Sequence, residues 1–118
     1  MISQKFLYLL AEACHEATKV ISEQILSEEK KEWKLIDSAT KARLINAVRR
    51  AIDDKVTDPA IAHANWVTDM EKDGWQFGDE FSEENKTHPC MVPYGELEVG
   101  QQTKDHIFLS ILKPFYYL

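Results

Sequence analysis

Residues 74–94 read GWQFGDEFSEENKTHPCMVPY, and this stretch decides how the rest of the chain is organised. It contains two of the four glycines and two of the four prolines, residue types that favour turns over regular helix. Trp75, Phe77 and Phe81 alternate with polar residues or glycine, a pattern typical of a short strand. We predict a partner strand at residues 90–92, with residues 82–89 as the connecting loop.

On both sides of this stretch, apolar residues recur at three- and four-residue steps, which predicts amphipathic helices. The expected helices cover roughly residues 3–26, 38–54, 59–73 and 100–112. Asp37 or Ser38 can cap the second helix, and Thr57-Asp58-Pro59 combines a capping side chain with proline at the first helical position. Gly74 is placed to end the third helix in a left-handed conformation.

The chain has 118 residues, a length that suits one domain with its own hydrophobic core. Its net charge of −6 and pI of about 5.2 argue against binding to duplex nucleic acid or to an anionic membrane surface. No apolar run approaches the length of a membrane-spanning helix. Cys14 and Cys90 come without a secretory signal, so we expect reduced thiols in a cytoplasmic protein.

The two halves of the chain share a faint internal repeat. Cys14-His15-Glu16-Ala17 in the first helix echoes Ala62-His63-Ala64-Asn65 in the third. Leu35 and Leu97 each precede a further helix. Each half then consists of a helix, an irregular aromatic connection and a second helix. These echoes predict one domain built from pseudo-repeats at about residues 1–56 and 57–118.

Several uncommon motifs follow one another in the second half. In chain order they are His63 with Trp66, Gly74-Trp75-Gln76-Phe77-Gly78, Asn85-Lys86-Thr87-His88-Pro89, Val92-Pro93-Tyr94-Gly95-Glu96-Leu97 and Lys104-Asp105. This order resembles the RyR repeat, first named in ryanodine receptor calcium channels and also found in small standalone bacterial and phage proteins. Cys14-His15-Glu16-Ala17 and Trp33 extend the resemblance to the first half. The chain departs from the family at Phe77, where tyrosine is usual, and at Glu98, where a proline often follows the leucine.

The resemblance implies a compact, pseudo-two-fold, mainly α domain of about four helices with short β-strands. It implies no channel, no enzymatic activity and no cofactor. Prokaryotic members of the family are associated with the sensing of small nucleotide-derived ligands. We therefore expect a non-enzymatic module that binds a small polar or nucleotide-like ligand. In a phage, such a module would sequester a host signal.

The leading candidate site combines Trp75 and Tyr94 with Asn85, Lys86 and His88. The aromatic faces would stack on a flat ring, and the polar side chains would hold polar or phosphate groups. The alternative is a loop staple, in which His88 bonds to backbone and the two aromatic rings close the core. Irregular connections need such side-chain partners for their backbone groups, so both interpretations stay open.

Arg43 and Arg50 lie seven residues apart on the second predicted helix, so their side chains project in the same direction. Together with Arg49 and Lys55, they offer a basic edge to which an anion could bind. The alternative is a solvated helix face, because acidic residues are interleaved with these cations.

Other arrangements have weaker support. The histidines at positions 15 and 63 are typical of satisfied core residues, and the spacing of the cysteines and histidines fits no known zinc pattern. Cys90 and His88 lack an orienting acid for nucleophilic catalysis. Pro114 ends the last helix and leaves an apolar tail, residues 115–118. This tail supports a second hypothesis, a structural or protein-interaction module that forms a homo-oligomer through it.

Overall fold

Three of the helices begin where a side-chain oxygen accepts a hydrogen bond from the first turn. The hydroxyl of Ser3 accepts from the backbone N–H of Phe6, at 3.1 Å. The carboxylate of Asp37 accepts from the N–H of Thr40 at 3.3 Å, and that of Asp58 from the N–H of Ala60 at 2.9 Å. Such caps satisfy backbone donors that have no partner inside the helix, so these short sequence signals determine where these three helices start.

The computed structural model describes residues 2–118. Its helices are α1 (Gln4–Gln24), α2 (Ser38–Asp54), α3 (Pro59–Lys72) and α4 (Val99–Leu112). Short 3₁₀ turns lie at Trp33–Leu35, Tyr94–Glu96 and Lys113–Phe115, and the strands are β1 (Gln76–Phe77) and β2 (Thr87–His88). The mainly α fold with four helices and short strands is confirmed. None of the described helices combines the length and the apolar character that crossing a membrane requires.

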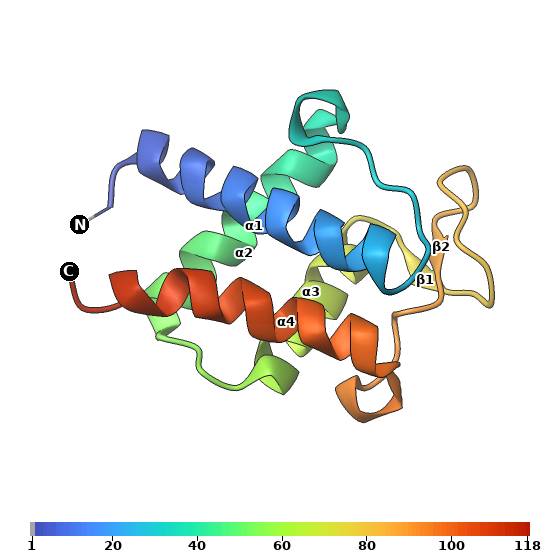
Figure 1. Cartoon of the computed structure of the whole chain (residues 1–118). Coiled ribbons are helices and arrows are strands. Elements are labelled where there is room, and N and C mark those ends of the chain that lie inside the picture. The colour runs from blue at the N-terminus through green and yellow to red at the C-terminus, as the bar shows by residue number, and fades with distance from the viewer. Residues whose placement is uncertain (1) are drawn as a thin grey trace.

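α1 and α4 lie side by side in opposite directions, with α2 and α3 behind them (Figure 1). The first and last parts of the chain are close together at one end, and the segment that carries β1 and β2 lies at the other end (Figure 1). The buried core between the helices includes Leu7, Leu10, Ala11, Cys14, Ile45, Val48, Ala51, Val56, Leu109, Leu112 and Tyr116. Both cysteines are free thiols.

The order helix, 3₁₀ turn, helix occurs twice, and one hydrogen bond recurs in both halves. In the first half, Nε2 of His15 lies 2.7 Å from the backbone oxygen of Lys31, two residues before the first 3₁₀ turn. In the second half, Nε2 of His63 lies 2.7 Å from the backbone oxygen of Val92, again two residues before a 3₁₀ turn. The two histidines therefore tie the first helix of each half to the connection that follows it.

The strand pairing differs from the prediction. β1 pairs with β2 in parallel, with Gln76 opposite Thr87 and Phe77 opposite His88, and residues 90–92 form no strand. An antiparallel bridge between Ser82 and Thr87 closes a tight loop, so the chain reverses twice before it enters β2. Two reversals restore the original direction, and this is why the pairing is parallel.

Two glycines are required by this connection. Gly74 has a φ of 89°, a left-handed conformation that lets the chain leave α3 sharply, as predicted. Gly78 lies against β2, where an added Cβ would come within 2.6 Å of Cβ of Thr87. A side chain at position 78 would push the two strands apart.

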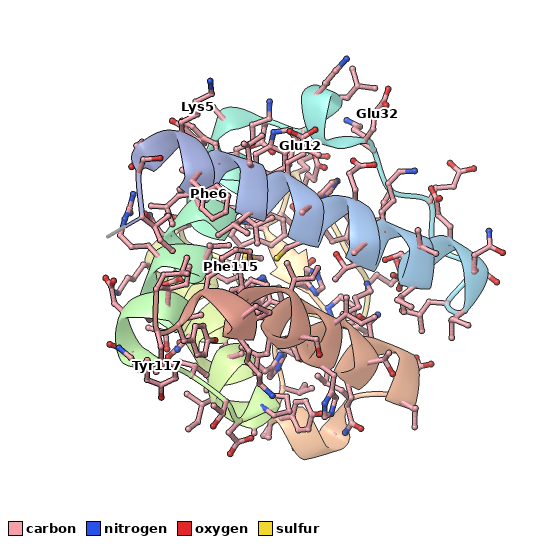
Figure 2. The ribbon with its side chains drawn as sticks, turned by 60° about the vertical axis from the view of Figure 1, so that its left-hand side comes forward. Lys5, Phe6, Glu12, Glu32, Phe115 and Tyr117 are labelled. Carbon is pink, nitrogen blue, oxygen red and sulfur yellow. The ribbon has the colours of Figure 1, made fainter. Side chains whose placement is uncertain are left out.

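Half of the apolar tail packs back on the domain. The rings of Phe6 and Phe115 point toward each other, with centroids 5.2 Å apart (Figure 2). Tyr116 is buried, and its hydroxyl donates to the backbone oxygen of Val56 at 2.6 Å. Tyr117 and Leu118 are exposed.

Candidate functional site

Aromatic side chains from three segments form one continuous row. In spatial order, the row contains Tyr94, His63, Trp66, His88, Phe81 and Trp75. Neighbouring ring centroids are 5.0–6.3 Å apart, within the range of favourable aromatic contact. The row joins α3 to both ends of the 74–94 connection, so it holds this irregular segment against the helices.

His88 occupies the middle of this row and also bonds to backbone. Its Nδ1 accepts a hydrogen bond from the N–H of Cys90 at 3.1 Å. Burial lowers the pKa of His88 to about 4, with a further lowering from the positive charges of Lys30 and Lys104. His88 is therefore neutral at physiological pH and carries its hydrogen on Nε2. These contacts match the loop-staple interpretation of this residue.

Lys86 and Asn85 also take part in loop structure. Nζ of Lys86 donates to the backbone oxygen of Asp73 at 2.8 Å, which ties the loop to the end of α3. Lys86 itself adopts a left-handed φ of 53° in the turn before β2. The backbone N–H of Asn85 donates to the hydroxyl of Ser82 at 3.1 Å, and the Asn85 side chain is exposed.

A groove of about 350 Å³ lies between α2 and α3. It is lined by Ala39, Ala42, Arg43, Asn46, Arg50, Asp69, Lys72 and Asp73. Three of these side chains are cations and two are carboxylates, so the lining is charged and carries a small positive excess.

Both arginines in this groove are paired with carboxylates of α3 and its cap. Arg43 donates to Asp73 at 2.7 Å, and Arg50 donates to Oδ1 of Asp69 at 2.5 Å. Oδ2 of Asp69 is buried and has no hydrogen-bond partner within residues 2–118. The guanidinium of Arg43 also lies 6.0 Å from the ring centroid of Trp75, which places the aromatic row beside the groove.

A second groove, of about 300 Å³, lies between α3 and the segment after β2. It is lined by Ala60, His63, Ala64, Val67, Met91, Val92, Pro93 and Tyr94. At 3.6 residues per turn, the α3 residues of this groove and those of the α2–α3 groove face opposite sides of the helix. The Tyr94 groove is apolar, whereas the α2–α3 groove is charged.

The structure therefore divides the site residues predicted from the sequence into separate places. Arg43 and Arg50 line the α2–α3 groove, with Trp75 and Lys86 joined to it through Arg43 and Asp73. Tyr94 lines the other groove, and His88 lies in the aromatic row between them.

The other two cations of the predicted basic edge lie elsewhere. Arg49 donates to Asn46 and Gln4, and Lys55 lies over the ring of Tyr117 at 5.3 Å. Sequence reasoning did not select Trp66, Asp69 or Lys72 as site residues. The three-residue spacing of Trp66, Asp69 and Lys72 along one helix was a signal that could have found them.

Comparison with known proteins gives one family. The family model described as RyR domain matches residues 46–116, which run from the middle of α2 to the buried tyrosine of the tail. No curated protein and no solved structure matches the chain.

Proposed function

The chain belongs to the RyR domain family, and from this premise we propose that it is a non-enzymatic module that binds a small anionic, nucleotide-like ligand. The observation that carries the proposal is the convergence of Arg43, Arg50 and Lys72 on one groove beside Trp75. Binding of this kind would allow the protein to sequester a nucleotide-derived signal.

The chemistry of this groove suits a ligand with both a phosphate and hydroxyl groups. Arginine presents a planar fork of N–H donors that matches phosphate oxygens, and Lys72 adds a compact positive charge. The carboxylates of Asp69 and Asp73 already accept from the arginines, which holds both guanidinium groups in place before a ligand arrives. The unpaired Oδ2 of Asp69 supports a hydroxyl donor on the ligand, with a local side-chain movement to expose it.

The test is thermal unfolding of the full chain with a panel of mono-, di- and cyclic nucleotides at millimolar concentration. A ligand at a hundred times its Kd adds about 2.7 kcal/mol to the free energy of unfolding, so we expect a rise in Tm of several degrees with at least one nucleotide. Absence of a shift with every nucleotide would count against the proposal.

Two substitutions on α2 then locate the site. Arg43→Ala removes a groove cation whose partner, Asp73, has 44% of its side chain exposed, so water can solvate the carboxylate that is left unpaired. We expect this variant to lose the nucleotide-induced shift. Arg49→Ala is the matched control, because Arg49 bonds to Asn46 and Gln4 and does not line the groove. Equal losses in the two variants would place binding elsewhere.

The second hypothesis, a protein-interaction module, is supported by the exposure of Tyr117 and Leu118. If these residues mediate self-association, the intact protein will have a dimer mass in sedimentation equilibrium. Deleting residues 117–118 will then return it to a monomer while Phe115 and Tyr116 keep the tail packed. A monomeric mass before the deletion would contradict this hypothesis and leave the ligand proposal untouched.

A further inference from the structure

The Tyr94 groove has apolar walls made mainly of short side chains. Ala60, Ala64 and Val67 form the α3 wall, and Met91, Val92 and Pro93 form the opposite wall. His63 and Tyr94 are the lining residues that bring ring nitrogens and a hydroxyl to this groove. A ligand that fits this groove would bury a hydrocarbon chain along the walls and place its polar group at the end near His63.

The protonation of His63 follows from its backbone contact. Its Nε2 lies 2.7 Å from the oxygen of Val92, and a carbonyl oxygen only accepts, so Nε2 carries the hydrogen. In the neutral ring, Nδ1 is then a bare acceptor. Oδ2 of Asp105 lies 3.9 Å from this Nδ1, beyond hydrogen-bond distance, and an ionised carboxylate also only accepts. When Asp105 is ionised, two acceptors thus face each other on side chains that are mostly buried, since His63 is 5% exposed.

The charge around Tyr94 is negative. Burial raises the pKa of the Tyr94 hydroxyl, and the carboxylates of Asp105 and Asp58 raise it further. The neighbouring cation, Lys104, is directed to Glu28, with Nζ 3.5 Å from a carboxylate oxygen. The groove therefore has the aromatic face of Tyr94 and Nδ1 of His63 in its lining, and the carboxylates of Asp58 and Asp105 lie close to it without lining it.

We propose that the Tyr94 groove is a second binding site, for a small organic cation of the primary alkylammonium class. The ammonium group donates to Asp105 and to Nδ1 of His63. Because these two acceptors are only 3.9 Å apart, its nitrogen lies to one side of the line that joins them, within hydrogen-bond distance of both. The alkyl chain lies along the α3 wall, and the ring of Tyr94 adds a favourable contact with the positive charge. This site differs from the proposed nucleotide site in its groove, in the face of α3 that it uses and in the charge of its ligand.

The test is a titration of ¹⁵N-labelled protein with n-butylammonium chloride, followed by the chemical shifts of the backbone amides. We expect saturable shifts clustered at residues 60–67 and 91–94. n-Butanol is the matched probe without charge and should bind at least about tenfold more weakly, because it cannot pair with a carboxylate. Clustered shifts of equal affinity with both probes would mean that the groove binds hydrocarbon alone, and would overturn the proposal.

Variants separate this site from the proposed nucleotide site. Asp105→Asn should weaken n-butylammonium binding by at least about tenfold, and Asp58→Asn should weaken it less, since Asp58 is engaged as a helix cap. Arg43→Ala should leave it unchanged. Unaltered binding in Asp105→Asn, or no clustered shifts at any concentration reached, would overturn the proposal, whatever the outcome with nucleotides.

The pH dependence of binding provides a further readout. Burial raises the pKa of Asp105 to about 7, and Lys104 opposes this rise. The groups that face Asp105 are Lys104 on its own helix, His63 on α3 and Tyr94 in the connection, whose hydroxyl lies 3.1 Å from His106. Binding of the cation should therefore weaken as the pH falls below about 7, where Asp105 takes up a proton. Affinity that stays constant between pH 8 and pH 5 would contradict the assigned role of Asp105.

Discussion

Replacing Leu112 by alanine is expected to lower the free energy of unfolding by about 2–5 kcal/mol, because the change removes buried methyl groups and leaves a cavity. Leu112 is fully buried in the last turn of α4, with 0% of its surface exposed. α4 packs on α1, and the 3₁₀ turn that follows Leu112 leads directly to the buried Tyr116. The cavity would therefore open in the core between α4 and α1.

Equilibrium unfolding in urea measures this effect, with the midpoint and the slope fitted separately. The matched control is Leu118→Ala, the same chemical change at a side chain that is 78% exposed, where we expect a change within about 0.5 kcal/mol. A loss below about 1 kcal/mol in Leu112→Ala would show that the core near α4 collapses around the missing side chain. Equal losses in both variants would contradict the packing described for the tail.

Replacing Asp105 by asparagine is expected to stabilise the protein at alkaline pH, by on the order of 2–4 kcal/mol. Burial raises the pKa of the carboxyl from 3.8 to about 7, with Lys104 opposing the rise. Between these two pH values, the folded protein keeps a proton that the unfolded chain releases. The wild-type protein therefore loses stability as the pH rises from about 4 to 7, and the full penalty remains above 7. Asparagine has no charge to bury, so the variant escapes this penalty.

His88 contributes to stability with the opposite sign. Burial lowers its pKa from 6.5 to about 4, so the unfolded chain binds a proton in this window and the folded protein does not. The contribution of His88 is present above pH 6.5 and is lost as the pH falls toward 4. In the wild-type protein, the pH dependence that His88 gives to the unfolding free energy partly cancels that of Asp105. His88 is present in both the wild type and the Asp105→Asn variant, so its contribution cancels when the two unfolding free energies are subtracted.

The informative measurement is therefore the difference in unfolding free energy between Asp105→Asn and wild type at several pH values. We expect a difference near zero at pH 4 that grows through pH 6 and levels off above pH 7. A difference that is independent of pH would mean that Asp105 ionises normally in the folded protein. A variant less stable than wild type at pH 8 would mean that the ionised carboxylate is stabilised in the folded protein, chiefly by Lys104.

Local features of the fold were predictable because they depend on neighbouring residues. Asp37, Asp58 and Gly74 act within one helical turn of their own position, and the structure places all three as expected. The pairing of β1 with β2 was not predictable in the same way. This pairing depends on a bridge between Ser82 and Thr87 that reverses the chain, and the spacing of apolar residues does not predict such a bridge.

The candidate site was predictable in composition but not in arrangement. The parallel projection of Arg43 and Arg50 follows from helical spacing, and both line one groove. Trp75 and Tyr94 belong to one connection in the sequence, yet His63, Trp66 and His88 lie between them in space. Because the connection turns back on itself, it places Trp75 and Tyr94 beside different faces of α3.

The sequence alone determined the family, the four helices and their approximate boundaries, and the residue types available for binding. These properties follow from capping chemistry, helical periodicity and the order of uncommon motifs, all of which act over short distances along the chain. Only the tertiary structure decided that α3 separates a charged groove at Arg43 from an apolar groove at Tyr94. It also decided that His63 and Asp105 meet as two acceptors, because that contact depends on how α3 and α4 pack and not on either helix taken separately.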